Sequence, residues 1–171
     1  MSGTVEVHVV TPEREVWAGQ AETVIARGVD GEVGILTGHA PMMVQLAIGP
    51  LRIQSEGQPE IAAVIDGGFM HVSSAADRDE VSAADRDEVS AAGREGAGAA
   101  GREGAGAAAT RVDVLATGAE LADDIDVEAA RARAAELQER LQDHDTHLAE
   151  AEIASLRSEL KKALARINLA S

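Results

Sequence analysis

The chain has 171 residues and a formal net charge of −15 at pH 7, which argues against a nucleic-acid partner because its phosphates would repel most of the protein surface. It contains no cysteine, so disulfides and thiolate metal sites are excluded, and its only aromatic residues are Trp17 and Phe69, so the core is expected to be aliphatic. The start has no secretory-signal pattern, and no apolar run reaches the ~20 residues that span a bilayer, so a cytoplasmic location without a transmembrane segment is expected.

The N-terminal part of the chain alternates short apolar, β-branched runs with turn residues. The runs that predict strands cover residues 6–10, 23–26, 33–36, 43–48, 51–54, 61–65 and 69–72. Turn signals such as Gly49-Pro50 and Asp66-Gly67-Gly68 separate them, and no helical pattern intervenes. Strands at this spacing predict an antiparallel β-sandwich rather than a parallel α/β sheet.

Residues 75–109 contain an internal repeat. The sequence Ala-Ala-Asp-Arg-Asp-Glu-Val-Ser occupies residues 75–82 and again 83–90, and a glycine-rich version follows twice. The unit has no apolar stripe with which to build a core. The next apolar run, residues 111–115, is suited to pair with residues 69–72. The repeat is therefore predicted to be an expanded hairpin loop, whose added length costs only ~2 kcal/mol of closure free energy.

The C-terminal part changes from strand to helix periodicity. Apolar residues recur at steps of three and four from Val127 to Leu141 and again from Ile153 to Ile167, and the polar residues 142–147 lie between these runs. Asp126 suits the N-cap of the first helix. The pattern predicts an antiparallel α-helical hairpin. The expected domains are a sandwich over residues 1–122, interrupted by the loop at 75–109, and a hairpin over residues 123–171.

The end of the chain is basic although the protein is acidic. Four cations lie within the last predicted helix: Arg157, Lys161, Lys162 and Arg166. Such a group is consistent with a solvated helix face that complements the helix dipole. A surface for an acidic partner is the alternative interpretation. The sequence alone leaves both interpretations open.

No common catalytic motif is present: the phosphate-binding, dinucleotide-binding and serine-hydrolase patterns are all missing from the sequence. His144 and His147, with Asp143 and Asp145, have a spacing that could hold a metal, but a solvated hairpin turn explains them as well. We therefore expect a protein that is not an enzyme and has no metal site.

The most specific stretch is Gly31-Glu32-Val33-Gly34-Ile35-Leu36-Thr37-Gly38-His39-Ala40-Pro41. Together with Pro12-Glu13-x-x-Val16-Trp17-x-Gly19 before it and Gly67-Gly68-Phe69 after it, this stretch resembles the epsilon subunit of bacterial F-type ATP synthases, a family that includes the mitochondrial delta subunit. The resemblance covers nearly the whole chain outside the repeat. It implies a non-catalytic central-stalk component that links the gamma subunit to the proton-transporting c-ring, at the cytoplasmic face of the bacterial plasma membrane.

The resemblance also implies roles for particular residues. The loop that matches Glu32, Gly34 and His39 would face the c-ring and gamma. The hairpin would switch between a packed and an extended state and, when extended into the alpha/beta head, would oppose ATP hydrolysis. The basic residues Arg157, Lys161, Lys162 and Arg166 would then face an acidic segment of the beta subunit.

One departure from the family concerns nucleotide binding. Some bacterial relatives bind ATP through an Ile-Asp-x-x-Arg-Ala motif, of which Ile125, Asp126 and Ala130 are present here. Ala129 replaces the arginine, which removes the charged, forked donor for a phosphate. No cofactor is therefore expected, and ATP binding should be weak or absent.

Two other classes remain to be distinguished from the epsilon-subunit hypothesis. A stand-alone β-sandwich binding module that dimerises through its hairpin predicts a stable dimer without affinity for gamma. A metal-dependent enzyme that uses His144 and His147 predicts metal bound on purification. Neither alternative explains the stretch from Gly31 to Pro41.

Overall fold

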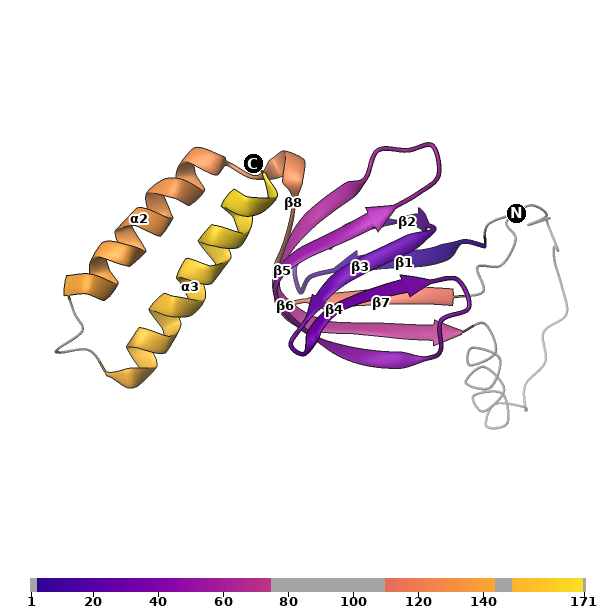
Figure 1. The fold of residues 1–171 in the computed structure, drawn as a ribbon, viewed down its shortest axis with the longest axis horizontal. Coiled ribbons are helices and arrows are strands. Elements are labelled where there is room, and N and C mark those ends of the chain that lie inside the picture. Colours follow the sequence, from indigo (N-terminus) through magenta and orange to yellow (C-terminus); the bar gives the residue numbers. More distant parts are fainter. Residues whose placement is uncertain (1–2, 75–109, 144–148, 171) are drawn as a thin grey trace, which may run out of the picture.

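The computed structural model of the protein describes residues 3–74, 110–143 and 149–170. Within them a β-sandwich is followed by two packed helices, which lie at one end of the strands (Figure 1). The strands are β1 (Val5–Val10), β2 (Glu15–Ala21), β3 (Thr23–Gly28), β4 (Gly31–Leu36), β5 (Met42–Gln54), β6 (Ile61–Ser74), β7 (Thr110–Ala116) and β8 (Ala119–Leu121).

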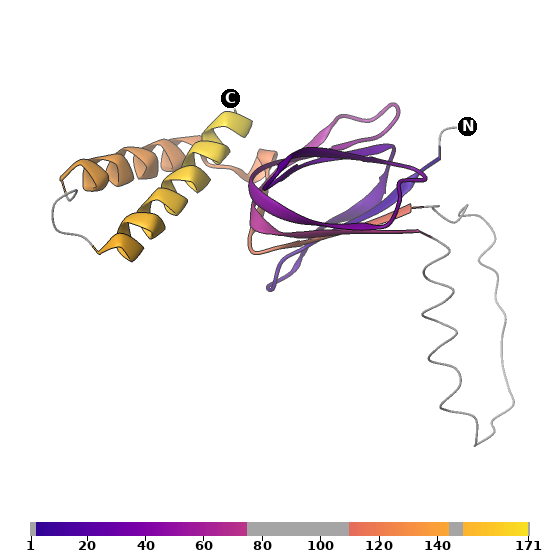
Figure 2. The same ribbon diagram turned by 60° about the horizontal axis from the view of Figure 1, so that its bottom comes forward.

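The strands are hydrogen-bonded in the order β2-β1-β7-β6-β5-β3-β4, and β8 pairs with β6. Every pair is antiparallel except β1 with β7, which is parallel. The turned view in Figure 2 shows the sheet curling round on itself, with strands on two sides of the interior that holds the core residues. The predicted antiparallel sandwich is thus confirmed, with one parallel pair added.

Two of the predicted strand boundaries are wrong. Gly49-Pro50 and Asp66-Gly67-Gly68 were expected as turns, but they lie inside the continuous strands β5 and β6. Both strands bend there, and Gly67 and Gly68 adopt φ angles of 92° and 130°, which favour glycine. The bend lets one long strand contribute to both layers of the sandwich, so the glycine signal marks a change of direction rather than an end.

Two further strands, β2 and β8, were not predicted. β2 mixes polar residues with glycine, and β8 has only three residues, so neither carries a clear alternation of apolar and polar positions.

The core of the sandwich is aliphatic, as expected. Strands β1 and β7 alternate buried and less buried positions, with Val5, Val7 and Val9 pointing inward from β1. Trp17 packs against this core while remaining partly exposed, and Phe69 is 48% exposed on the outer surface. The two aromatic residues therefore contribute little to the interior.

The predicted pairing across the repeat is confirmed. Phe69 lies opposite Leu115 and Val72 opposite Val112, and the β6–β7 ladder continues to the pair Ser74 and Thr110. The repeat joins two neighbouring antiparallel strands, which is the connection expected of a hairpin loop. The residues of the repeat themselves lie outside the described part of the chain.

The helical hairpin consists of α2 (Val127–Asp143) and α3 (Glu150–Leu169), which follow the short 3-10 helix η1 (Ala122–Asp124). As predicted, Asp126 caps α2, because its Oδ1 accepts a hydrogen bond of 3.0 Å from the backbone N–H of Ala129. The predicted seam is buried at Ala130, Ala134, Leu137, Leu156 and Ala163. No described helix is long and apolar enough to span a membrane.

Candidate functional site

The sandwich has two ends with different neighbours. The hairpin packs at the end where β5 and β6 bend, and the ends of β6 and β7 that flank the repeat lie at the other (Figure 1). Because each strand runs from one end to the other, residues close in sequence can lie far apart in the molecule. This geometry decides which of the predicted site residues lie together.

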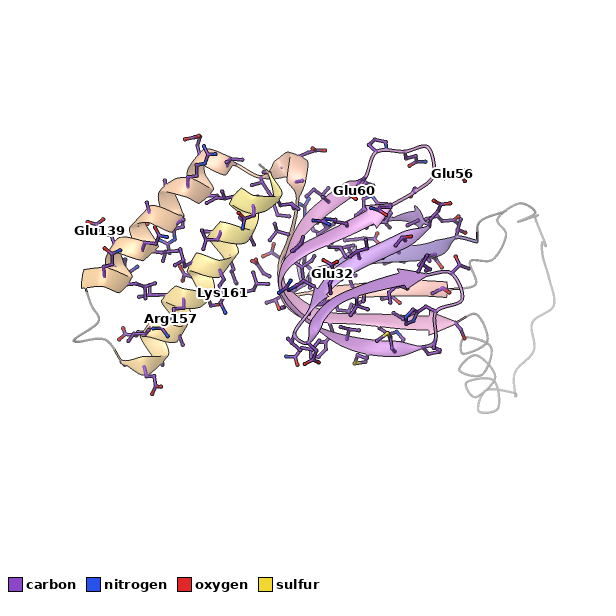
Figure 3. The ribbon with its side chains drawn as sticks, viewed as in Figure 1. Glu32, Glu56, Glu60, Glu139, Arg157 and Lys161 are labelled. Carbon is purple, nitrogen blue, oxygen red and sulfur yellow. The ribbon has the colours of Figure 1, made fainter. Side chains whose placement is uncertain are left out.

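Glu32 and His39 lie at opposite ends of β4. Glu32 is the second residue of β4, where it pairs with Arg27 near the hairpin (Figure 3). His39 follows the other end of the strand, and the neighbouring Gly38 N–H donates a 2.7 Å hydrogen bond to the Thr110 hydroxyl. His39 Nδ1 lies 2.8 Å from the carbonyl oxygen of Ala40, so its side chain bonds to its own loop. These two residues therefore do not form one compact site.

Gly34 lies in the middle of β4 and is exposed. Its backbone pairs with Ile25, and a Cβ placed on it would meet no atom within 4 Å. Its φ angle is not in the left-handed region. Nothing in the packing of the described residues therefore requires glycine at this position.

A row of exposed apolar side chains lies on the outer face of β5, β6 and β7, and sequence reasoning missed it. Met43, Phe69 and Leu115 are 68%, 48% and 54% exposed. Leu115 pairs with Phe69, and Met43 pairs with His71, two residues beyond Phe69 on the same face. We call Met43, Phe69 and Leu115 the apolar face. The strand alternation could have placed these side chains outside, once Met70, Val72 and Val114 were assigned to the core.

A charged network borders the apolar face on β1, β2 and β7. His8 Nδ1 lies 2.8 Å from Glu15 Oε1, and His8 Nε2 lies 3.3 Å from Glu6 Oε1. Arg111 forms a 2.9 Å ion pair with Asp113. The hydrogen bond to Glu15 is the main cause of a raised pKa for His8, and it outweighs the lowering effect of burial. The outer surface is thus apolar along one row and charged along the next.

Four charged residues connect the hairpin to the sandwich. Arg166 Nε donates a 2.7 Å hydrogen bond to Glu120 Oε2, and its Nη1 lies 3.3 Å from Asp66 Oδ1. Lys162 Nζ lies 3.6 Å from the other oxygen of Asp66, whose side chain is only 13% exposed. Burial lowers the pKa of Arg166, but its bonds to Asp66 and Glu120 raise it by more. We call Asp66, Glu120, Lys162 and Arg166 the clasp.

The clasp divides the basic residues of α3 into two pairs. Lys162 and Arg166 are bound to the sandwich, whereas Arg157 and Lys161 are exposed and form no ion pair with any residue that the structure describes (Figure 3). Of these four α3 cations, Arg157 and Lys161 are therefore the two that remain available to another protein in the packed state.

Two of the three matched nucleotide-motif residues, Asp126 and Ala130, border a groove of about 330 Å³ between the helices and β8, whereas Ile125 is buried and does not line it. Asp126, Ala129 and Ala130 line it together with three cations, Arg133, Lys162 and Arg166. Each cation already has carboxylate partners: Arg133 bonds Glu136 and Glu159, and the other two belong to the clasp. A phosphate would have to displace these carboxylates.

The described residues, 3–74, 110–143 and 149–170, contain no group of three or more histidine or acidic side chains that is arranged to hold a metal ion. His144 and His147, the residues of the metal hypothesis, lie outside these ranges.

Comparisons with a family model and with individual known proteins agree on one family. Residues 4–83 match the model of the β-sandwich domain of the ATP synthase delta/epsilon chain. The chain is 33% identical to the ATP synthase epsilon chain of Desulforamulus reducens, with 99% of both chains covered. It is 37% identical to the epsilon chain of Brevibacillus brevis over 79% of this chain and 76% of that one.

Solved structures share the fold. A chain in the mitochondrial ATP synthase of Euglena gracilis, described as OSCP, F1 and c-ring, superposes with a TM-score of 0.66 at 19% identity, covering 96% of this chain and 80% of that chain. A chain in the central stalk and c-ring structure of the Tetrahymena thermophila mitochondrial ATP synthase gives a TM-score of 0.50 at 12% identity.

Proposed function

Because this chain belongs to the ATP synthase delta/epsilon-chain family, as an epsilon chain and hence a non-catalytic subunit of the central stalk, we propose that it couples the gamma subunit to the c-ring. The relatives are bacterial, which supports a peripheral position at the cytoplasmic face of the plasma membrane. The main support for the coupling role is the apolar face, because it offers a binding surface for gamma. The other parts of the proposal depend on gamma binding there.

The apolar face is the surface that we assign to gamma. Met43, Phe69 and Leu115 expose large side chains on three adjacent strands. Contiguous exposed apolar surface marks protein–protein contacts, because leaving it in water has a free-energy cost that a partner removes. The neighbouring charged network of His8, Glu15 and Arg111 supplies a polar rim of the kind that surrounds an interface.

Gly34 supports a partner contact on β4. Its own chain leaves room for a side chain, so a glycine there is best explained by the close approach of another backbone. Glu32 and His39 flank it at the two ends of the strand. We therefore assign β4 and its two flanking loops, rather than one loop, to the surface that meets the c-ring and gamma.

The hairpin is the element that we assign to regulation of hydrolysis. Its buried seam lies between its own helices, and the sandwich core contains no hairpin residue. This separation supports two units, residues 1–122 and 123–171, that can move apart without exposing the sandwich core. Extension toward the alpha/beta head would break the clasp and release Lys162 and Arg166 to join Arg157 and Lys161 opposite the beta subunit.

Capture by gamma tests the coupling role. The purified chain is mixed with tagged gamma subunit from the same organism, and the bound stoichiometry is measured. Wild type should bind one to one, and Phe69→Asp should bind at least tenfold more weakly because a charge would be buried at the interface. Leu164→Asp is the matched control, since Leu164 is 39% exposed on the hairpin instead of the sandwich.

Two results would contradict the proposal. Equal loss of capture in Phe69→Asp and Leu164→Asp would remove the apolar face from the interface. A stable dimer of the chain that ignores gamma would favour a stand-alone binding module. A version without residues 75–109 is included, because capture only by that version would show that the repeat blocks docking.

A further inference from the structure

A second groove lies between the sandwich and the outer side of α3, away from the clasp. It has a volume of about 360 Å³, and its walls come from β3, β5 and α3. Three cations line it, and no carboxylate does: Arg27, Arg52 and Lys161. In a chain with a net charge of −15, three cations without an acidic neighbour in the lining form a distinct local feature.

The strand cations share one surface. Arg52 pairs with Ile25, and Arg27 follows Ile25 by two residues, so both side chains project from the outer face of adjacent strands. A Cβ on Gly49 would lie 3.0 Å from Arg27 Cβ, so the arginine stem passes directly over this glycine. The sheet wall therefore carries two arginines side by side above the β5 bend.

The opposite wall is provided by α3. Lys161 and Leu164 lie on the side of α3 that borders the groove, and Leu164 is 39% exposed. Lys162 and Arg166 point to the clasp instead. The helix thus uses two cations, Lys162 and Arg166, to hold the sandwich and places a third, Lys161, beside an apolar surface.

The three cations form no ion pair with any described residue. Arg27 is the cross-strand partner of Glu32 on β4, yet no contact within 4 Å joins their charged groups. All three side chains are exposed. Each is therefore available to a charge brought by another molecule.

We propose that this groove docks an acidic, amphipathic polypeptide segment of a partner protein. Exposed cations bind a small anion only weakly, because water screens each contact. A polypeptide can contact all three cations at once and also cover apolar surface at Leu164, Ile48 and Pro50. The carboxylates should lie nearest Arg52 and Lys161, since the last carbonyl groups of α3 carry partial negative charge near Leu169.

Such a segment would keep the hairpin packed. One wall of the groove belongs to the sandwich and the other to α3, so the complete site exists only while the two units are in contact. A ligand that binds one conformation shifts the population toward it. This role goes beyond the coupling function and does not require gamma.

The test uses the full-length chain and a fluorescein-labelled 18-residue helical peptide that carries glutamate on one face and leucine on the other. Fluorescence anisotropy should show saturable binding at low salt that weakens at high salt. Lys161→Gln and Arg52→Gln should each raise the Kd about three- to fivefold. Arg157→Gln is the matched control, because Arg157 is an exposed cation one helical turn from Lys161 that does not line the groove.

The outcomes separate the proposal from general electrostatic attraction. The proposal is supported if Arg157→Gln keeps full affinity for the peptide while Lys161→Gln and Arg52→Gln both lose affinity. An equal effect of all three variants, equal binding of a peptide with glutamine in place of glutamate, or no binding by wild type overturns it. Displacement of the peptide by inorganic pyrophosphate at a similar concentration would identify a small-anion site and would also overturn it.

Discussion

At the scale of single residues, the motifs that resemble the epsilon family contain glycines that occupy their positions for different physical reasons. A Cβ on Gly68 would lie 2.2 Å from the carbonyl oxygen of Leu115, and its φ angle is 130°. A Cβ on Gly19 would lie 2.9 Å from the ring of Trp17, which packs over it. Gly34 has neither constraint. The backbone therefore requires glycine at position 68, Gly19 leaves room for the Trp17 ring, and nothing within the described part of the chain requires glycine at position 34.

Replacing Gly68 with alanine should strongly destabilise the sandwich. The added methyl group collides with backbone that cannot move independently, and the φ angle is strained for any residue with a Cβ. We expect a loss of roughly 3 kcal/mol in the free energy of unfolding. Urea denaturation measures it, and Gly34→Ala, which meets no atom, should change stability by less than about 0.5 kcal/mol.

The His8 network predicts a pH dependence of stability. The pKa of His8 is raised above 6.5 in the folded state, chiefly by its hydrogen bond to Glu15. The protonated form therefore stabilises the fold below pH 6.5, and this contribution is lost as the pH rises through the folded pKa. The effect should stay below about 1 kcal/mol because the site is partly exposed.

Urea denaturation at several pH values between 5.5 and 8.5 would reveal the His8 effect. Glu15→Gln should flatten the dependence, because it removes the carboxylate that favours the charged imidazole. An unchanged slope in that variant would assign the pH dependence to another group.

Ala129 predicts weak nucleotide binding. It lines the groove beside Asp126 but offers no donor to a phosphate, and the cations nearby are held by carboxylates. Isothermal titration should show no saturable binding of ATP below millimolar concentration. Ala129→Arg should increase the affinity by supplying the missing forked donor. Tight binding by wild type would contradict this prediction.

At the scale of elements, the packed hairpin depends on two kinds of contact. Within the hairpin, Leu137 and Leu156 are buried between α2 and α3. Between the hairpin and the sandwich, the clasp supplies the only ion pairs found among the described residues. Because Asp66 forms ion pairs with both Lys162 and Arg166, one substitution at this position weakens two of the three contacts.

Asp66→Asn should shift the hairpin toward open states. The substitution leaves the partly buried Arg166 with one carboxylate partner and Lys162 with none, at a cost of roughly 1–2 kcal/mol. Because the chain has no cysteine, two introduced cysteines, Glu56→Cys and Arg157→Cys, can be labelled for a fluorescence distance measurement. The mean distance should increase in Asp66→Asn.

Glu159→Gln serves as the control for the clasp measurement. It removes an ion pair with Arg133 inside the hairpin and leaves the clasp intact, so the measured distance should stay the same. A distance that is unchanged in both variants would show that the clasp does not hold the hairpin.

At the scale of the whole molecule, the repeat joins strands that need only a short connection. Ser74 and Thr110 are paired at the end of the β6–β7 ladder, so a tight turn could link them. They also lie at the end of the sandwich opposite the hairpin (Figure 1). Changes in the length of this connection should therefore leave both the core and the hairpin contact intact.

Replacing residues 75–109 with Asn-Gly should preserve the fold and raise its stability. Shortening the loop lowers the entropy cost of closing it, by about 2 kcal/mol on the logarithmic law. Urea denaturation would measure the gain, and gamma capture would show whether docking is retained. A loss of stability would mean that the repeat contributes contacts to the folded protein.

The parts of the fold that depend on local pattern were predicted correctly. The alternation in β1 and β7, the three- and four-residue spacing in α2 and α3, and the Asp126 cap each follow from neighbours in sequence. The pairing of Phe69 with Leu115 across the repeat was also foreseen, since two apolar strands flank one loop. The continuity of β5 and β6 through their glycine bends was not predicted. The same residue types, glycine, proline and aspartate, occur at bends within a strand and at turns between strands, so their presence does not distinguish the two.

By itself, the sequence determined the sandwich, the hairpin and the family, since periodicity and motif order are written along the chain. Tertiary structure alone decided how the candidate residues are grouped. It separated Glu32 from His39 along β4 and divided the basic residues of α3 between the clasp and the open surface. It also brought Arg27 and Arg52 to the groove beside Lys161. Such groupings depend on which distant segments pack together, and local spacing carries no information about that.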